Sequence, residues 1–115
     1  MSEMELNSAI LAKKDKRKSN KLSKVIPTVI YKKNGEVCLV NALGMDVVKM
    51  VVDTERSKTH KSVSEIKICE DIELKELIFN AGYESSMKTY RYWDITSERD
   101  LLDKFRNYKF KKVYP

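Results

Sequence analysis

The sequence predicts a small α+β domain in the order β-β-α-β-α-β-α, with its helices packed on one face of a sheet. Three observations lead to this expectation. A chain of 115 residues is long enough for one domain. Its hydrophobic share of 42% is enough for one modest core. Stretches rich in β-formers alternate with stretches whose apolar residues recur every three or four positions. We expect residues 25–115 to form the domain.

Residues 1–24 are expected to form a basic extension that is flexible when free. Residues 13–24 hold seven basic side chains against one acidic one, and Leu22 is their only large apolar residue before the domain begins. Such a composition buries too little apolar surface to fold alone. Leu6 and Ile10, four residues apart, favour one or two helical turns before this run, which would be marginal in isolation.

The first two elements are predicted to be strands joined by a tight hairpin turn. Residues 25–31 are rich in Val, Ile and Thr, which favour strands. Pro27 lacks an amide proton, which restricts this stretch to an edge strand or places Pro27 at a strand's start. Asn34-Gly35 supplies two residues that tolerate positive φ, as a tight turn requires. Residues 36–42 would then be the returning strand.

Residues 45–56 are predicted to be a helix, although their valines favour a strand by type. The charged side chains fall on one face, opposite the valines, at helical spacing, and they are Asp46, Lys49, Asp53 and Arg56. The strand alternative stays open. Residues 54–61 are polar and predict a loop, and residues 62–69 predict a strand with Ile66 and Ile68 on one face.

The C-terminal half predicts two further helices around a strand. Asp71 is placed to cap a helix whose buried stripe is expected to include Leu74 and Ile78, and Gly82 can accept the left-handed conformation after its end. Residues 87–95 predict a strand. Ser97 with Asp100 resembles a capping box, and an amphipathic helix with Leu101, Phe105 and Tyr108 on one side is expected to follow. Residues 110–115 are expected to form no element.

No catalytic or metal-binding pattern stands out, so the sequence predicts no enzyme, no metal and no cofactor. His60 is the only histidine and lies in a Lys-rich polar loop. A phosphate-binding glycine loop and the common hydrolase motifs are missing. The acids near residues 70–76 and 94–103 are sufficiently explained by helix starts, where the dipole stabilises negative charge.

The cysteines and the apolar runs indicate a soluble, intracellular protein, cytoplasmic or nuclear. Cys38 and Cys69 lie in apolar stretches and form no metal knuckle. We expect buried free thiols in a reducing compartment, with a single bridge between them left open. No run reaches the roughly 18–20 apolar residues of a membrane span, and the acidic N-terminus is unlike a secretory signal.

The basic ends favour a non-enzymatic accessory or structural protein associated with RNA or a ribonucleoprotein, or with DNA. Lysines that neutralise phosphates give affinity without reading sequence. Aromatic residues interleave with basic ones near residues 90–93 and 105–112, which would suit stacking on unpaired bases. The candidate phosphate contacts are Lys13, Lys14, Lys16, Arg17, Lys18, Lys21, Lys24, Arg91, Lys109, Lys111 and Lys112.

A second hypothesis belongs to another class. The same small size and mixed charge suit a protein-binding module, such as a viral or mobile-element factor that docks on a host protein complex. Leu6, Ile10 and the exposed side of residues 97–108 would then make the contact.

Overall fold

The computed structural model describes residues 24–57, 62–83 and 91–115. Within them five strands form one antiparallel sheet in the order β4-β2-β1-β3-β5, accompanied by three helices. This confirms a small α+β domain. The chain order is β1 (Val25–Lys32), β2 (Val37–Leu43), α2 (Met45–Ser57), β3 (Val63–Ile68), α3 (Ile72–Asn80), β4 (Tyr92–Asp94), α4 (Arg99–Phe105) and β5 (Lys111–Tyr114).

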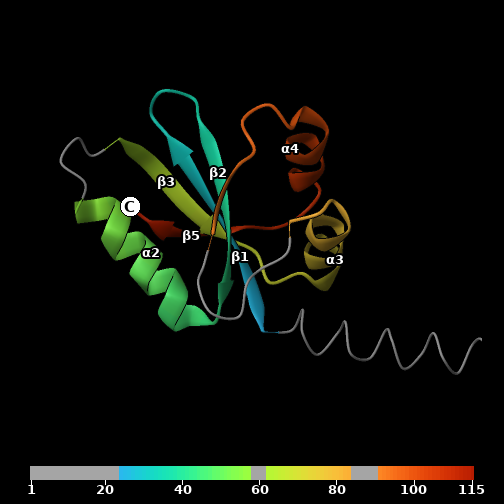
Figure 1. Cartoon of the computed structure of the whole chain (residues 1–115), viewed down its shortest axis with the longest axis horizontal. Helices are drawn as coiled ribbons and strands as arrows, with labels where there is room; N and C mark the ends of the chain where they lie inside the picture. Colours follow the sequence, from blue (N-terminus) through green and yellow to red (C-terminus); the bar gives the residue numbers. More distant parts are fainter. Residues whose placement is uncertain (1–23, 58–61, 84–90) are drawn as a thin grey trace, which may run out of the picture.

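The helices lie on both faces of the sheet, so the expectation of a single covered face is wrong (Figure 1). On one face, α2 packs Val51 against Ile30 and Ile66. On the other face, α3 and α4 cover Val29 and Leu39 with a second cluster, whose helical members are Leu74, Ile78, Leu101 and Phe105. Because successive strand residues point to opposite faces and both faces are covered, β1 and β2 are largely apolar along their length, with Thr28 and Asn41 as their buried polar residues.

The predicted hairpin is confirmed, and its loop has three residues. The Lys32 amide donates to the Glu36 carbonyl at 2.9 Å, so Lys33, Asn34 and Gly35 form the loop. Gly35 has φ +92°. This conformation is strained for a residue with a side chain but costs glycine little free energy. The side chain of Asn34 accepts from the Glu36 amide at 3.0 Å. Such three-residue hairpin loops with a left-handed glycine are common.

Pro27 occupies the start of a strand, not an edge. β1 is the central strand, and its pairing with β3 begins only at Thr28, after the proline. Because Pro27 precedes this pairing, its missing amide proton removes no hydrogen bond from the β1–β3 ladder. Its carbonyl accepts from the Cys69 amide at 3.3 Å, where β3 has ended.

The local sequence explains both α2 and α3. Residues 45–57 form α2, as the charge spacing predicted. Asp71 caps α3, since its side chain accepts from the Glu73 amide at 2.9 Å. Beyond the end of α3, Gly82 has φ +98° and its amide donates to the Phe79 carbonyl at 3.0 Å. Such paired caps at both ends define a helix of nine residues.

Three expectations for the C-terminal part need correction. Residues 87–90 of the expected strand lie outside the described residues, and within residues 91–95 the strand is β4, three residues long. Ser97 does not cap α4, which begins after Glu98 without a side-chain cap. The stretch expected to form no element contains β5, which pairs with β3 and makes the outer edge of the sheet.

Candidate nucleic-acid interface

Of the predicted phosphate contacts, the structure describes Lys24, Arg91, Lys109, Lys111 and Lys112, and all five are exposed. The other six lie outside the described residues: Lys13, Lys14, Lys16, Arg17, Lys18 and Lys21. Leu6, Ile10 and His60 lie outside them too. The described part carries nearly equal numbers of basic and acidic side chains, so most of the net charge of +6 belongs to the remaining residues.

The C-terminal lysines lie at the same end of the sheet as Lys24. Lys111 is level with Ile68 of β3, and Ile68 is level with Thr28 of β1. β5 runs in the same direction as β1, because each is antiparallel to β3. Residues before Lys111 and before Thr28 therefore approach the same end, although they are far apart in sequence. Lys24 immediately precedes β1 at that end.

Arg91 lies at the opposite edge and does not join these lysines. It directly precedes β4, and β4 and β5 are the two outer strands of the sheet. The guanidinium carbon of Arg91 lies 4.0 Å from the centre of the Trp93 ring, a cation–π contact. The Trp93 ring in turn forms a T-shaped contact with Tyr83, with ring centres 5.2 Å apart and an angle of 80° between the ring planes. Arg91 therefore already has an aromatic partner, Trp93, within the domain.

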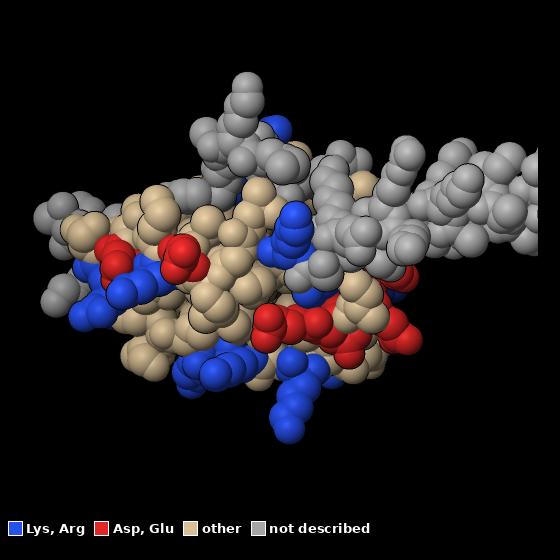
Figure 2. Space-filling view, turned by 90° about the horizontal axis from the view of Figure 1, so that it is seen from below, with Lys and Arg blue, Asp and Glu red and all other residues tan. Residues whose placement is uncertain are grey.

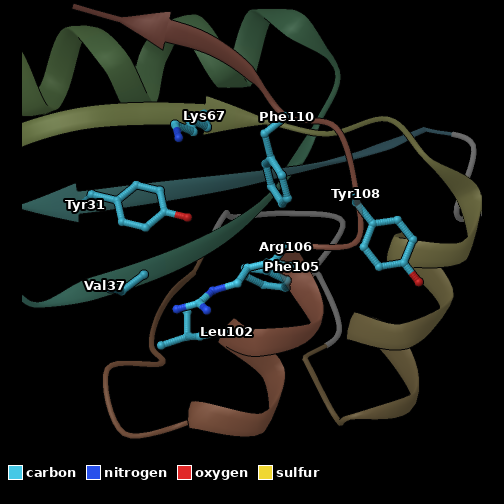
Figure 3. A pocket seen from close by; sticks show the side chains of 8 residues that line it. All are labelled: Tyr31, Val37, Lys67, Leu102, Phe105, Arg106, Tyr108 and Phe110. Carbon is cyan, nitrogen blue, oxygen red and sulfur yellow. The ribbon is translucent and has the colours of Figure 1, made fainter.

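A groove of about 330 Å³ opens on the face of the sheet opposite α2, beside α4. Figure 3 shows Tyr31 of β1 and Phe110 above the helix, with Tyr31 directing its hydroxyl into the space between them. Lys67 of β3 and Arg106 contribute the two cations of the lining. The remaining lining residues are Val37, Leu102, Phe105 and Tyr108, and in Figure 3 the Tyr108 ring points away toward α3.

The groove arises because α3 and α4 cover only part of this face. They pack on Val29 and Leu39, in the middle of β1 and β2, and leave Tyr31 half-buried at the border of that cluster. Phe110 closes the cluster by packing on Phe105, with ring centres 5.5 Å apart and a tilt of 50°. Aromatic faces at the rim of a core keep one side available to solvent.

A charged network borders the groove. The Glu65 carboxylate lies 3.3 Å from the amines of both Lys67 and Lys112. Lys67 also lies 5.6 Å from the centre of the Tyr31 ring. Burial opposes the ionisation of Glu65, but hydrogen bonds and positive charge from the two lysines outweigh it and lower the pKa of that carboxyl. Glu65 is therefore ionised at neutral pH and pairs with both lysines, of which Lys67 lies beside Tyr31.

Burial, and second the negative charge of Glu65, raise the pKa of the Tyr31 phenol above its ordinary value. Its hydroxyl therefore stays neutral at physiological pH and adds no negative charge to the groove. The groove combines four aromatic residues, two aliphatic ones and two cations in one concave surface.

Tyr31, Glu65 and Lys67 are functional candidates that sequence reasoning missed. Each occupies one position of an otherwise ordinary strand, and no motif links the two strands. Only the antiparallel pairing of β1 with β3, which sets Tyr31 opposite Glu65, places them together. The predicted interleaving of aromatic and basic residues at 105–112 did contain a signal, since Arg106 and Phe110 line the groove.

Outside the groove, charges of both signs are interspersed. Figure 2 shows a face on which groups of Lys and Arg lie directly beside Asp and Glu. On the exposed side of residues 97–108, every exposed position is polar or charged.

The two cysteines lie on opposite sides of the sheet and are free thiols. Cys38 belongs to the cluster under α2, and Cys69 to the cluster of α3 and α4. Burial is the main cause that raises the pKa of both thiols. The bridge left open by the sequence therefore does not form. In the described ranges no group of three or more His, Cys, Asp or Glu side chains is arranged to hold a metal ion.

No helix in the described part of the chain has the length and apolar character needed to cross a membrane. Comparisons with protein families, with curated proteins and with solved structures find no match to this chain.

Proposed function

We propose that this protein is a non-enzymatic accessory or structural protein that binds the phosphate backbone of RNA, alone or in a ribonucleoprotein. The observation that carries the proposal is the position of the C-terminal lysines. Lys109, Lys111 and Lys112 are exposed at the end of the sheet where Lys24 joins the basic run to the domain. Lys24 and these C-terminal lysines, far apart in sequence, thus lie toward the same end of the sheet.

The charges at this end are available to an anionic ligand. Lys24, Lys109 and Lys111 have no acidic partner within 4.0 Å in the described part of the chain, and Lys112 shares Glu65 with Lys67. Lysines that contact phosphates release condensed counterions, so their affinity depends strongly on salt and little on base sequence. Binding of this kind needs no preformed pocket.

The test is a salt titration of the full chain against labelled single- and double-stranded RNA and DNA. One variant replaces Lys109, Lys111 and Lys112 by Gln, and another replaces the seven basic residues of 13–24 by Gln. The matched control replaces three exposed cations elsewhere by Gln, and these are Lys33, Lys49 and Arg56.

We expect the full chain to bind RNA with an affinity that falls steeply as salt rises. Removing one lysine–phosphate interaction with a single strand should reduce the slope of log K against log salt by about 0.7. Both basic-end variants should show a shallower slope, and the control should keep the slope of the wild type. Absence of binding at low salt, or an equally shallow slope in the control, would refute the proposal.

A further inference from the structure

We infer that the groove between Tyr31 and Phe110 binds an unpaired base of a single-stranded nucleic acid. The inference rests on the proposed function and names the form of nucleic acid that this protein selects. The groove has about 330 Å³, near the lower limit of small-molecule sites, which is suited to one nucleotide unit rather than a larger ligand. A paired base inside a duplex has no free face to offer it.

The lining has the chemistry that base stacking requires. Two rings, from Tyr31 and Phe110, come from different segments of the chain and lie toward the same opening (Figure 3). Both are half-buried, so each is held by the core on one side and reaches solvent on the other. Every base has a π-face, so stacking on such rings binds single strands with little sequence preference.

Charge complementarity favours a nucleotide over an uncharged occupant. Lys67 and Arg106 line the groove, and the acid beside Lys67, Glu65, is also paired with Lys112. A phosphate attached to the stacked base would meet a net positive rim. Phe110 also directly precedes the strand that carries Lys111 and Lys112, so the groove is continuous with the basic end of the sheet.

The test compares the full-length protein with a variant that carries Tyr31→Leu and Phe110→Leu. Leucine keeps an apolar side chain at both sites and removes the rings, and every cation stays in place. The matched control is Tyr114→Leu, because Tyr114 packs on the α2 side of the same sheet. The probes are a labelled 12-nucleotide oligouridylate and an RNA duplex of the same length, measured by fluorescence anisotropy.

We expect the double variant to bind the single strand roughly 5- to 100-fold more weakly than the wild type, as the removal of ring stacking implies. Its affinity for the duplex and its salt slope should stay unchanged, and the control should bind both probes normally. Tyr31→Phe keeps the ring and should bind like the wild type. Should the double variant fail to fold by circular dichroism, Phe110→Leu alone carries the same comparison with a smaller effect.

Three outcomes would overturn the inference. If single strand and duplex bind equally and the leucine variant weakens neither, the groove takes no base, while the proposed phosphate binding stands. If Tyr31→Phe weakens binding as much as the double leucine variant does, the hydroxyl matters and stacking does not. If a polyglutamate peptide binds as tightly as the oligouridylate and its binding also requires the rings, the groove is a site for an acidic protein. Absence of any RNA binding by the wild type refutes the proposed function itself.

Discussion

Replacing Glu65 by Gln should lower the stability of the protein and raise its affinity for RNA. The carboxylate lies 3.3 Å from the amines of both Lys67 and Lys112. The lysine side chains are 34% and 52% exposed, so each ion pair is screened by solvent. Pairs of this kind contribute about 0.2–1 kcal/mol each. We expect Glu65→Gln to cost about 1 kcal/mol and to lower the Tm by about 4–8 °C.

The affinity change has the opposite sign. Removal of the carboxylate frees Lys67 and Lys112 for phosphates and takes away the negative charge beside the groove cations. One added phosphate contact on a single strand steepens the salt slope by about 0.7, which corresponds to about fivefold tighter binding at 0.1 M salt. The assay is anisotropy with a labelled single-stranded RNA at several salt concentrations. Asp53→Asn is the control, because it removes one exposed negative charge from α2, on the other face of the sheet.

The stability difference should also depend on pH. Folding lowers the pKa of Glu65, because the two lysines outweigh the opposing effect of burial. A carboxyl of this kind stabilises the fold fully above its unfolded pKa of about 4.3, and the contribution is lost as the pH falls through the folded value. Wild type and Glu65→Gln should therefore converge in urea midpoint in strong acid. Equal affinity gains in Glu65→Gln and Asp53→Asn, or a stability gap that persists in strong acid, would refute the reasoning.

Two further predictions concern the fold alone. Asp71→Ala removes the side-chain acceptor of the Glu73 amide at the start of α3 and should lower the free energy of unfolding in urea by about 1 kcal/mol. Asp71→Asn should keep most of the stability. An unchanged urea midpoint in the alanine variant would contradict the role of Asp71 as a cap. The thiols of Cys38 and Cys69 are buried, and burial raises the pKa of both, so they should react with a disulfide reagent roughly tenfold or more slowly in the native protein than in urea. Equal reaction rates in the native protein and in urea would mean that the helices covering one face of the sheet separate readily from it.

Local chemistry in the sequence determined the order of most elements. Asp71 and Gly82 mark the ends of α3 because a side-chain acceptor and a left-handed residue satisfy backbone groups that the helix itself leaves unpaired. The Asn34-Gly35 pair marks the hairpin for a similar local reason. In residues 45–57 the helical spacing of apolar and charged side chains prevailed over the β-propensity of the valines, because Val48 and Val51 are buried against the sheet.

Tertiary structure decided the faces, the edge strand and the groove. A helix's apolar stripe shows that it packs on the sheet, but not on which face, so the two-sided arrangement was not predictable from spacing. β5 begins with two exposed lysines, a weak strand signal, and is held by its pairing with β3. Tyr31, Lys67 and Phe110 share a groove only because sheet pairing joins segments distant in sequence. Composition revealed the basic ends, whereas the surface that would give them selectivity depends on contacts between residues that no local pattern connects.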